Sequence, residues 1–335
     1  MLCLSCESTA HTFGIAIVDE KCNILANEKD TYTTTSGGMI PRELMEHHYD
    51  KANEVLLRAL AKANVKMKDI DLISYSQGPG IGNALRCGAI FARQLSLLHN
   101  ITLIGVNHCV AHIEIGRKLC DAADPVMLYA SGANTQIICY ENNYYRVFGE
   151  TLDTGIGNFL DTFGRKMGMG FPAGPELDKR YFLGKKLIEL PYTVKGMDLA
   201  FSGLLTSATE KYQKLIKENA KDKEQKINDL IYSTLHTAFA MLTEVTERAL
   251  AHTEKKQVIL GGGVGCSKAL QQMVGKMCEE RGATLFVPPN SVMVDNAAMI
   301  GWLGIIMHNA NNKTPLNKSG IMPKQRTDDI RVNWR

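Results

Sequence analysis

The 335-residue sequence lacks any uninterrupted apolar run that approaches the length of a transmembrane helix. Residues 1–7 contain no basic leader and reach an acid at once, so we expect no signal peptide and a cytoplasmic protein without a membrane partner. Neither sign of charge dominates, because 38 Lys and Arg stand against 35 Asp and Glu. This weak surplus neither requires nor excludes a nucleic-acid partner.

A disulfide framework is also missing. The nine cysteines are an odd number without regular spacing, which is typical of a reducing compartment. Cys3 and Cys6 form a CxxC, but on a strand their side chains point to opposite faces, and no second CxxC completes a zinc site. We therefore expect the cysteines to be structural thiols. The length of the chain is sufficient for one large core or two domains.

Hydrophobic alternation and turn residues predict a mixed α/β organisation. In the first third of the chain, a meander precedes strand–helix units, with strands at 2–6, 13–18, 22–32, 71–76 and 102–106 and helices at 41–64, 84–98 and from 108. A turn is expected at 36–38. The first helix carries His47 and His48, which cannot both face inward, and we expect the pair on its solvated side.

The same order of elements begins again at residue 126. Strands at 126–130, 136–140 and 144–150 repeat the meander, and a strand from 258 with a glycine turn and a helix repeats the later unit. The pattern predicts a duplicated chain whose two similar lobes face each other across a nucleotide cleft.

The duplication also predicts the domain boundaries. We expect an N-terminal α/β lobe at 1–124, with a helix at about 295–310 packing back on it. A C-terminal lobe at 125–325 would contain a helical insert at about 151–256. The stretch 311–335 is polar with scattered basic residues and is expected to be loosely packed.

Three glycine-rich turns lie between predicted strands and helices, at 78–82, 131–135 and 261–265. Glycine lets a backbone approach a phosphate closely, and a helix N-terminus offers unpaired N–H groups. Such turns often only pack a helix on a sheet, and neither a Walker loop nor a complete dinucleotide fingerprint is present. Their symmetric placement favours a nucleotide site.

Two histidines four residues apart, His108 and His112, lie on one face of a predicted helix, and both can reach a single metal ion. A chance pair is the alternative. Asp295, at the start of a later helix, strengthens the metal hypothesis, because two His and one Asp suit a catalytic divalent cation with open positions.

Three further acids follow strands or lie near helix starts. Asp161 and Asp178 could accept hydrogen bonds from a ribose or an exocyclic amine, or could simply cap helices. Glu7, at the end of the first strand, is a candidate for positioning water or metal, with an ordinary turn carboxylate as the alternative.

Six motifs, taken together and in this order, resemble the archaeal and eukaryotic branch of the tRNA threonylcarbamoyladenosine transferases, the catalytic subunit of the KEOPS complex. They are HxxxH at 108–112, SGANT at 131–135, GIGNFLD at 155–161, FSG at 201–203, GGGV at 261–264 and DNA at 295–297. The resemblance covers essentially the whole chain. It implies a duplicated α/β fold of the actin/Hsp70/sugar-kinase class, which agrees with the repeat.

The resemblance implies a reaction and a ligand set. The threonylcarbamoyl group of threonylcarbamoyl-AMP would pass to the exocyclic amine of the adenosine 3′ to the anticodon in tRNAs that read ANN codons, releasing AMP. One divalent metal ion, iron or zinc, would be held by His108, His112, Tyr129 and Asp295. The ATP-derived AMP part of the donor would meet Tyr129, Ala130, Ser131, Gly132, Ala133, Asp161, Gly174, Asp178 and Ser267.

Two positions differ from the family's usual pattern. Ser267 replaces a common Asn, keeping a hydroxyl but losing the amide fork, and Asp178 replaces a Glu. A base could assist the weakly nucleophilic amine, and Glu7 and His11 are both candidates.

The implied partners are tRNA, a small atypical protein kinase that is fused after the C-terminus in some archaea, a small dimerising KEOPS subunit and further KEOPS subunits. A metalloprotease is excluded, because Cys109 stands where HExxH requires Glu. A small-molecule kinase or ATPase on the same fold, and a scaffold that binds a kinase, remain as alternatives.

Overall fold

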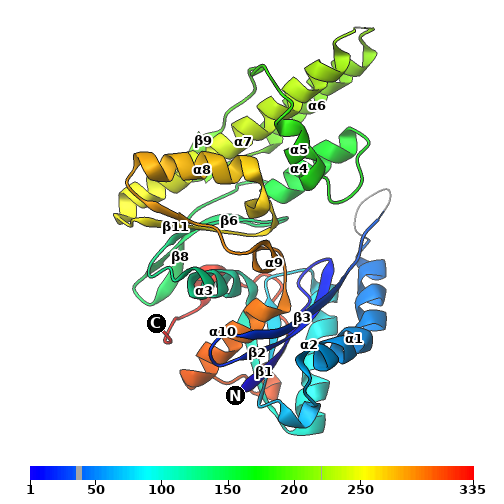
Figure 1. The fold of residues 1–335 in the computed structure, drawn as a ribbon, viewed down its shortest axis with the longest axis vertical. Helices are drawn as coiled ribbons and strands as arrows, with labels where there is room; N and C mark the ends of the chain where they lie inside the picture. Colours follow the sequence, from blue (N-terminus) through cyan, green and yellow to red (C-terminus); the bar gives the residue numbers. More distant parts are fainter. Residues whose placement is uncertain (35–39, 220) are drawn as a thin grey trace.

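The computed structural model describes residues 1–34, 40–219 and 221–335, so the turn expected at 36–38 lies outside the described residues. Two five-stranded sheets have the same topology (Figure 1). In each sheet an antiparallel meander is extended by two parallel strands, in the orders β3-β2-β1-β4-β5 and β8-β7-β6-β11-β12. The predicted duplicated α/β fold is confirmed.

The strands of the first sheet are β1 (Leu2–Glu7), β2 (Thr12–Asp19), β3 (Ile24–Thr31), β4 (Leu72–Gly78) and β5 (Thr102–Asn107). Those of the second sheet are β6 (Val126–Ala130), β7 (Thr135–Glu141), β8 (Tyr144–Glu150), β11 (Gln257–Gly261) and β12 (Thr284–Phe286). A separate small pair consists of β9 (Val194–Lys195) and β10 (Asp198–Leu199).

Helices and sheets alternate in layers (Figure 1). One face of the first sheet packs against α1 (Pro41–Ala63) and α2 (Gly82–His99). A shared core between the two sheets contains α3 (His108–Cys120) and α10 (Ala297–Asn309). The far face of the second sheet packs against α7 (Lys223–Thr253) and α8 (Lys268–Glu280). The same core continues outward to α4 (Ile156–Lys166), α5 (Gly174–Tyr181) and α6 (Ser202–Lys217).

The remaining helical elements are short: α9 (Asn290–Met293) and the 3-10 turns Met67–Asp69, Gly263–Cys266, Leu316–Lys318 and Thr327–Asp329. None of the helices in the described ranges is long and apolar enough to cross a membrane. The expected orientation of the CxxC is confirmed, since Cys3 packs in the core between the sheets and Cys6 in the core under α1 and α2.

The expectation of a loosely packed tail is wrong. After α10, the Thr314 N–H donates to Leu103 on β5 at 3.1 Å, and the Met322 N–H donates to Gln77 on β4 at 2.7 Å. Farther along, the Val332 N–H donates to Asn143 beside β8 at 2.7 Å. The polar tail hydrogen-bonds to both sheets through its backbone and through side chains such as Arg326 and Thr327, and its polarity alone does not reveal these contacts.

The expectation for the histidine pair on α1 is wrong for His48, which is fully buried. Its Nε2 donates to the Ala10 carbonyl at 2.9 Å, and its ring meets Phe13 edge-on. His47 lies closer to the surface and bonds Asp30 at 2.8 Å. The long α1 therefore holds the turn between β1 and β2 through a buried imidazole.

Because the His48 imidazole is buried, we expect the protein to lose stability in mild acid. Burial, aided by neighbouring His47, lowers the pKa of His48 to about 4. The unfolded chain, with a His pKa of about 6.5, therefore takes up the proton first, and the free energy of unfolding falls as the pH drops from 6.5 to 4. Urea unfolding measures the free energy of unfolding at pH 7 and at pH 4.5. Between these pH values the wild type should lose about 2–3 kcal/mol more stability than His48→Gln. Equal losses in both proteins would contradict this.

Candidate active site

The two predicted metal-binding histidines occupy the first turns of α3. β5 ends at Asn107, whose side chain caps the helix by accepting the Val110 N–H at 3.1 Å. The i, i+4 spacing then puts His108 and His112 on one face, with their rings 4.8 Å apart. Both are nearly fully buried, at 4% and 3% exposure.

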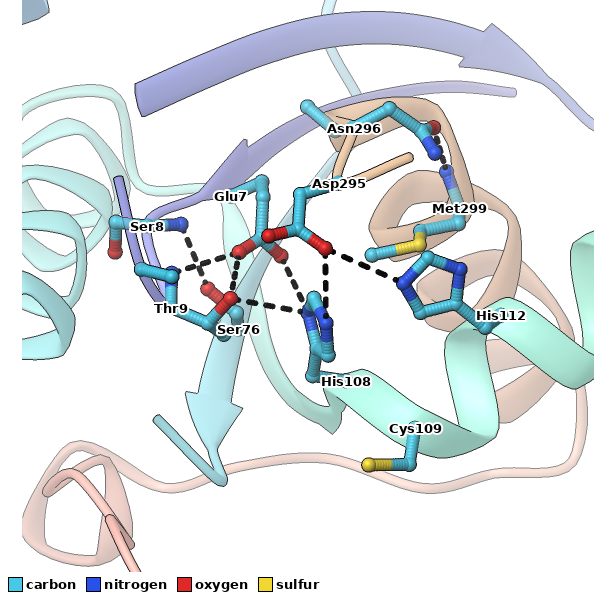
Figure 2. A network of polar contacts seen from close by, with 12 residues as sticks. Glu7, Ser8, Thr9, Ser76, His108, Cys109, His112, Asp295, Asn296 and Met299 are labelled. Carbon is cyan, nitrogen blue, oxygen red and sulfur yellow. Dashed lines mark hydrogen bonds and ion pairs between the residues drawn. The ribbon is translucent and has the colours of Figure 1, made fainter. Parts of the chain in front are cut away.

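Asp295 reaches these rings from the loop before α10 (Figure 2). Its Oδ1 lies 3.4 Å from His108 Nε2 and 3.5 Å from His112 Nε2. The next residue, Asn296, fixes the loop, because its side chain accepts the Met299 N–H and donates to the Val292 and Val294 carbonyls. The structure thus brings together three of the four predicted metal ligands.

The spacing of these three atoms fits a metal ion. Ligand atoms bound at about 2.0–2.1 Å in a tetrahedron lie roughly 3.3 Å apart, close to the two distances to Asp295. Apart from Asp295 at 3.5 Å, the buried Nε2 of His112 has no hydrogen-bond partner within the described ranges, and a bound cation would satisfy it.

Charges in the centre also favour a cation. Burial acts to lower the pKa of His108, but Glu7 and Asp295 outweigh it and raise that pKa well above its ordinary value. Burial lowers the pKa of His112, with Asp295 opposing it. Burial acts to raise the pKa of Asp295, but the two imidazoles hold it well below its ordinary value. A proton or a divalent cation can supply the positive charge.

The fourth predicted ligand, Tyr129, comes from the second sheet. Its buried ring at the end of β6 lies 5.1 Å from that of His112, centre to centre. Burial, Cys109 and Asp295 raise the pKa of Tyr129 well above its ordinary value, so the phenol stays protonated unless a cation is near.

Glu7 and His11 flank the turn between β1 and β2 but have different surroundings. Glu7 is fully buried, and its Oε2 lies 3.1 Å from His108 Nδ1. His11 lies outside this network, half-buried, with its ring edge-on to Phe171 at 5.5 Å.

The turn after β6 offers open N–H groups. Gly157 and Asn158, at the start of α4, donate their N–H groups to the carbonyls of Ser131 and Gly132 at 3.0 and 2.9 Å. By contrast, the N–H groups of Gly132 and Ala133 have no acceptor in the part of the chain that the structure describes. These two exposed N–H groups lie at the tip of the turn between β6 and β7, and adjacent backbone N–H groups of this kind can donate to a phosphate oxygen.

The other glycine turns pack closely against neighbouring turns. Gly262 has a φ of 83°, and a Cβ there would lie 2.3 Å from the Ala130 carbonyl oxygen. β11 runs parallel to β6, with Gly261 opposite Tyr129, so these two turns meet at one sheet edge. In the first half, a Cβ at Gly80 would lie 2.6 Å from the Thr9 oxygen.

The predicted nucleotide-binding acids already have partners. Asp161 accepts the Ala173 N–H at 2.8 Å, immediately before Gly174 begins α5. Asp178 accepts the Ser267 hydroxyl at 2.5 Å and the Lys268 N–H at 3.1 Å at the start of α8. Ser267 itself caps α8. These contacts join α4 to α5 and α5 to α8, and the start of α4 bonds the turn at 131–133.

Sequence reasoning missed Thr9. Its Oγ1 lies 3.2 Å from His108 Nδ1 and donates to Glu7 Oε1. A Ser-Thr turn after a strand gives no local signal that its Thr contacts a candidate metal ligand, because Thr9 and His108 are 99 positions apart.

Solved structures with similar folds have low sequence identity. HypF of Thermococcus kodakarensis gives a TM-score of 0.61 at 16% identity, covering 92% of this chain and 47% of its own. The activator of 2-hydroxyisocaproyl-CoA dehydratase from Clostridium difficile gives 0.54 at 12%, covering 93% and 97%. These likenesses support the actin/Hsp70/sugar-kinase fold.

Sequence relatives identify the family. The model of the TsaD family, tRNA N6-adenosine threonylcarbamoyltransferase, matches residues 22–302. The enzyme of that name from Thermococcus kodakarensis is 49% identical, with 100% of both chains covered. A probable bifunctional tRNA threonylcarbamoyladenosine biosynthesis protein of Methanocaldococcus jannaschii is 46% identical, and the match covers 100% of this chain and 60% of that protein. As the motifs predicted, the chain belongs to the tRNA N6-adenosine threonylcarbamoyltransferase family and is a transferase.

Proposed function

We propose that the protein transfers the threonylcarbamoyl group of threonylcarbamoyl-AMP to the exocyclic amine of the adenosine 3′ to the anticodon in tRNAs that read ANN codons, as part of KEOPS. The family name covers the transfer to tRNA adenosine; the donor, the position and the complex are the proposal. The main support is the end of β6. There Tyr129 lies beside His112, and Gly132 and Ala133 offer free N–H groups.

The donor is a mixed carbamic–phosphoric anhydride, which is already activated. The site must therefore hold it and stabilise the charge that develops as AMP leaves. The N–H groups of Gly132 and Ala133 would donate hydrogen bonds to a phosphate oxygen. The rest of the nucleotide would lie among Tyr129, Ala130, Ser131, Asp161, Gly174, Asp178 and Ser267.

The metal ligands would be His108, His112, Tyr129 and Asp295, around one divalent cation, iron or zinc. When bound, the cation supplies a Lewis acid for the carbonyl or phosphoryl oxygen of the donor. Asp295 contributes the anionic oxygen of the three-residue cluster, and this oxygen lies within 3.5 Å of both imidazole Nε2 atoms.

His11 is the proposed proton acceptor. Glu7 is engaged by His108 and Thr9 and has no contact with solvent, whereas His11 is only half-buried on the same turn. An imidazole there would take the proton that the adenosine amine loses as the new bond forms.

The proposed partners are tRNA, a small atypical kinase, a small dimerising KEOPS subunit and further KEOPS subunits. The bifunctional relatives support a kinase partner. The match covers only about 60% of each of them, so the rest of their length could hold a second function, here proposed to be the kinase. The weak net charge of +3 supports tRNA binding that is shared with these subunits.

The decisive experiment follows labelled threonine into unmodified tRNA, with the adenylate-forming enzyme and the partners supplied and each omitted in turn. We expect wild type to label the adenosine 3′ to the anticodon, and His11→Gln to be slower by about 10²-fold or more. Unlabelled tRNA with continued ATP hydrolysis would favour the alternative kinase or ATPase. Equal rates for wild type and His11→Gln would remove His11 as the base.

A further inference from the structure

The two histidines of the proposed metal centre differ in the contacts of Nδ1, the ring nitrogen that lies farther from Asp295 (Figure 2). His108 Nδ1 lies 3.1 Å from Glu7 Oε2 and 3.2 Å from Thr9 Oγ1. His112 Nδ1 is buried and, over the residues that the structure covers, has no hydrogen-bond partner. One imidazole is therefore fixed on both sides and the other is not.

The hydrogen atoms of this network can be assigned. Thr9 donates to Glu7 Oε1 twice, from its N–H at 2.7 Å and from its hydroxyl at 2.5 Å. Because its hydroxyl proton is used, Thr9 Oγ1 can only accept from His108. A carboxylate also only accepts, so His108 Nδ1 must carry a proton, and Nε2 is the nitrogen left to bind a metal.

The network is attached to the centre of the first sheet. Glu7 ends β1, which pairs with β2 on one side and β4 on the other. The Ser8 N–H donates to Ser76 Oγ at 3.0 Å and so ties the turn to β4. Glu7 and Thr9 are thus held by rigid strands, whereas α3 supplies only the histidine.

We propose that Glu7 and Thr9 are positioning residues that fix His108 as the anchoring metal ligand, bound through Nε2. This inference rests on the proposed metal site, and it gives Glu7 a role that acts through His108 in place of base catalysis. His112 would be oriented by packing and by the ion itself. Outer partners of this kind commonly change metal affinity by about 10–100-fold.

The variants are Glu7→Gln, which removes the charge, Thr9→Val, which removes the hydroxyl, and Thr9→Ser, which restores it. The matched control is Glu114→Gln on α3, the helix that carries His108. Glu114 is also buried, at 3% exposure, but it bonds Tyr145 and Trp334. Affinity for Zn²⁺ alone is measured by chelator competition, without tRNA or donor, and urea unfolding of each protein without metal checks its fold.

We expect Glu7→Gln and Thr9→Val to bind Zn²⁺ about 10–100-fold more weakly than wild type, with Thr9→Ser and Glu114→Gln close to wild type. Nitrogen-15 NMR of zinc-loaded wild type should show His108 bound through Nε2 with its proton on Nδ1. Binding through Nδ1, or an unchanged affinity of Glu7→Gln, would overturn the proposal. If these results hold while wild type fails to label tRNA, only the proposed function fails.

Discussion

Replacing Asp295 by Asn is expected to slow threonylcarbamoyl transfer by about 10³-fold or more. Asp295 is the only carboxylate within 3.5 Å of both imidazole Nε2 atoms among the described residues, and an amide leaves neutral groups around the cation. Lewis-acid stabilisation is worth several kcal/mol, and about 1.4 kcal/mol corresponds to each tenfold change in rate.

The measurement is single-turnover transfer of labelled threonine from preformed donor to unmodified tRNA, with metal content determined on the same samples. Asp19→Asn is the control, because Asp19 caps a surface turn at the far end of β2. We expect Asp295→Asn to lose both metal and transfer. Normal metal content with lost transfer would show that Asp295 is not a ligand, and a rate within tenfold of wild type would contradict the metal site.

Replacing Gly262 by Ala is expected to lower the free energy of unfolding by roughly 2–6 kcal/mol. The backbone there has a φ of 83° and a ψ of 160°, a conformation that costs a non-glycine residue about 1–3 kcal/mol. The new Cβ would also lie 2.3 Å from the Ala130 oxygen and 2.6 Å from its carbonyl carbon, and relieving such an overlap typically costs about 1–3 kcal/mol more.

The adjacent glycine provides the control. A Cβ at Gly263 would meet nothing within 4 Å, so Gly263→Ala should change the stability little. Urea unfolding of both variants and of wild type measures the difference. Because the clash pushes on Ala130, directly before the turn at 131–133, AMP binding should weaken in Gly262→Ala as well. Equal stability of the two variants would refute the backbone argument.

Local sequence signals were sufficient to predict most of the elements and the duplication. The helix predicted at 41–64 is α1, because Pro41 suits its first turn and Asn64 ends it in a left-handed conformation. The paired histidines of α3 were visible because helical spacing alone puts them on one face. Each of these features depends on residues within one or two turns.

Features that depend on distant contacts could not be predicted in this way. Burial of His48 follows from its bond to Ala10, which exists only when α1 packs across the first meander. The polar tail is ordered by carbonyls of β4 and β5, and Thr9 matters only because β5 delivers His108 to it. The family motif and the start of a helix were sufficient to predict Asp295 as a metal ligand. Its closeness to the two histidines became visible only in the folded structure.

The position of the proposed metal centre between the two sheets has a mechanical consequence. His108 follows β5, and Asp295 precedes α10, which packs on the first sheet. Tyr129, in contrast, belongs to the second sheet. An ion held by all four proposed ligands would therefore cross-link the two halves of the molecule. Loading and losing metal would then change how freely the halves move against each other, in addition to changing the chemistry at the donor.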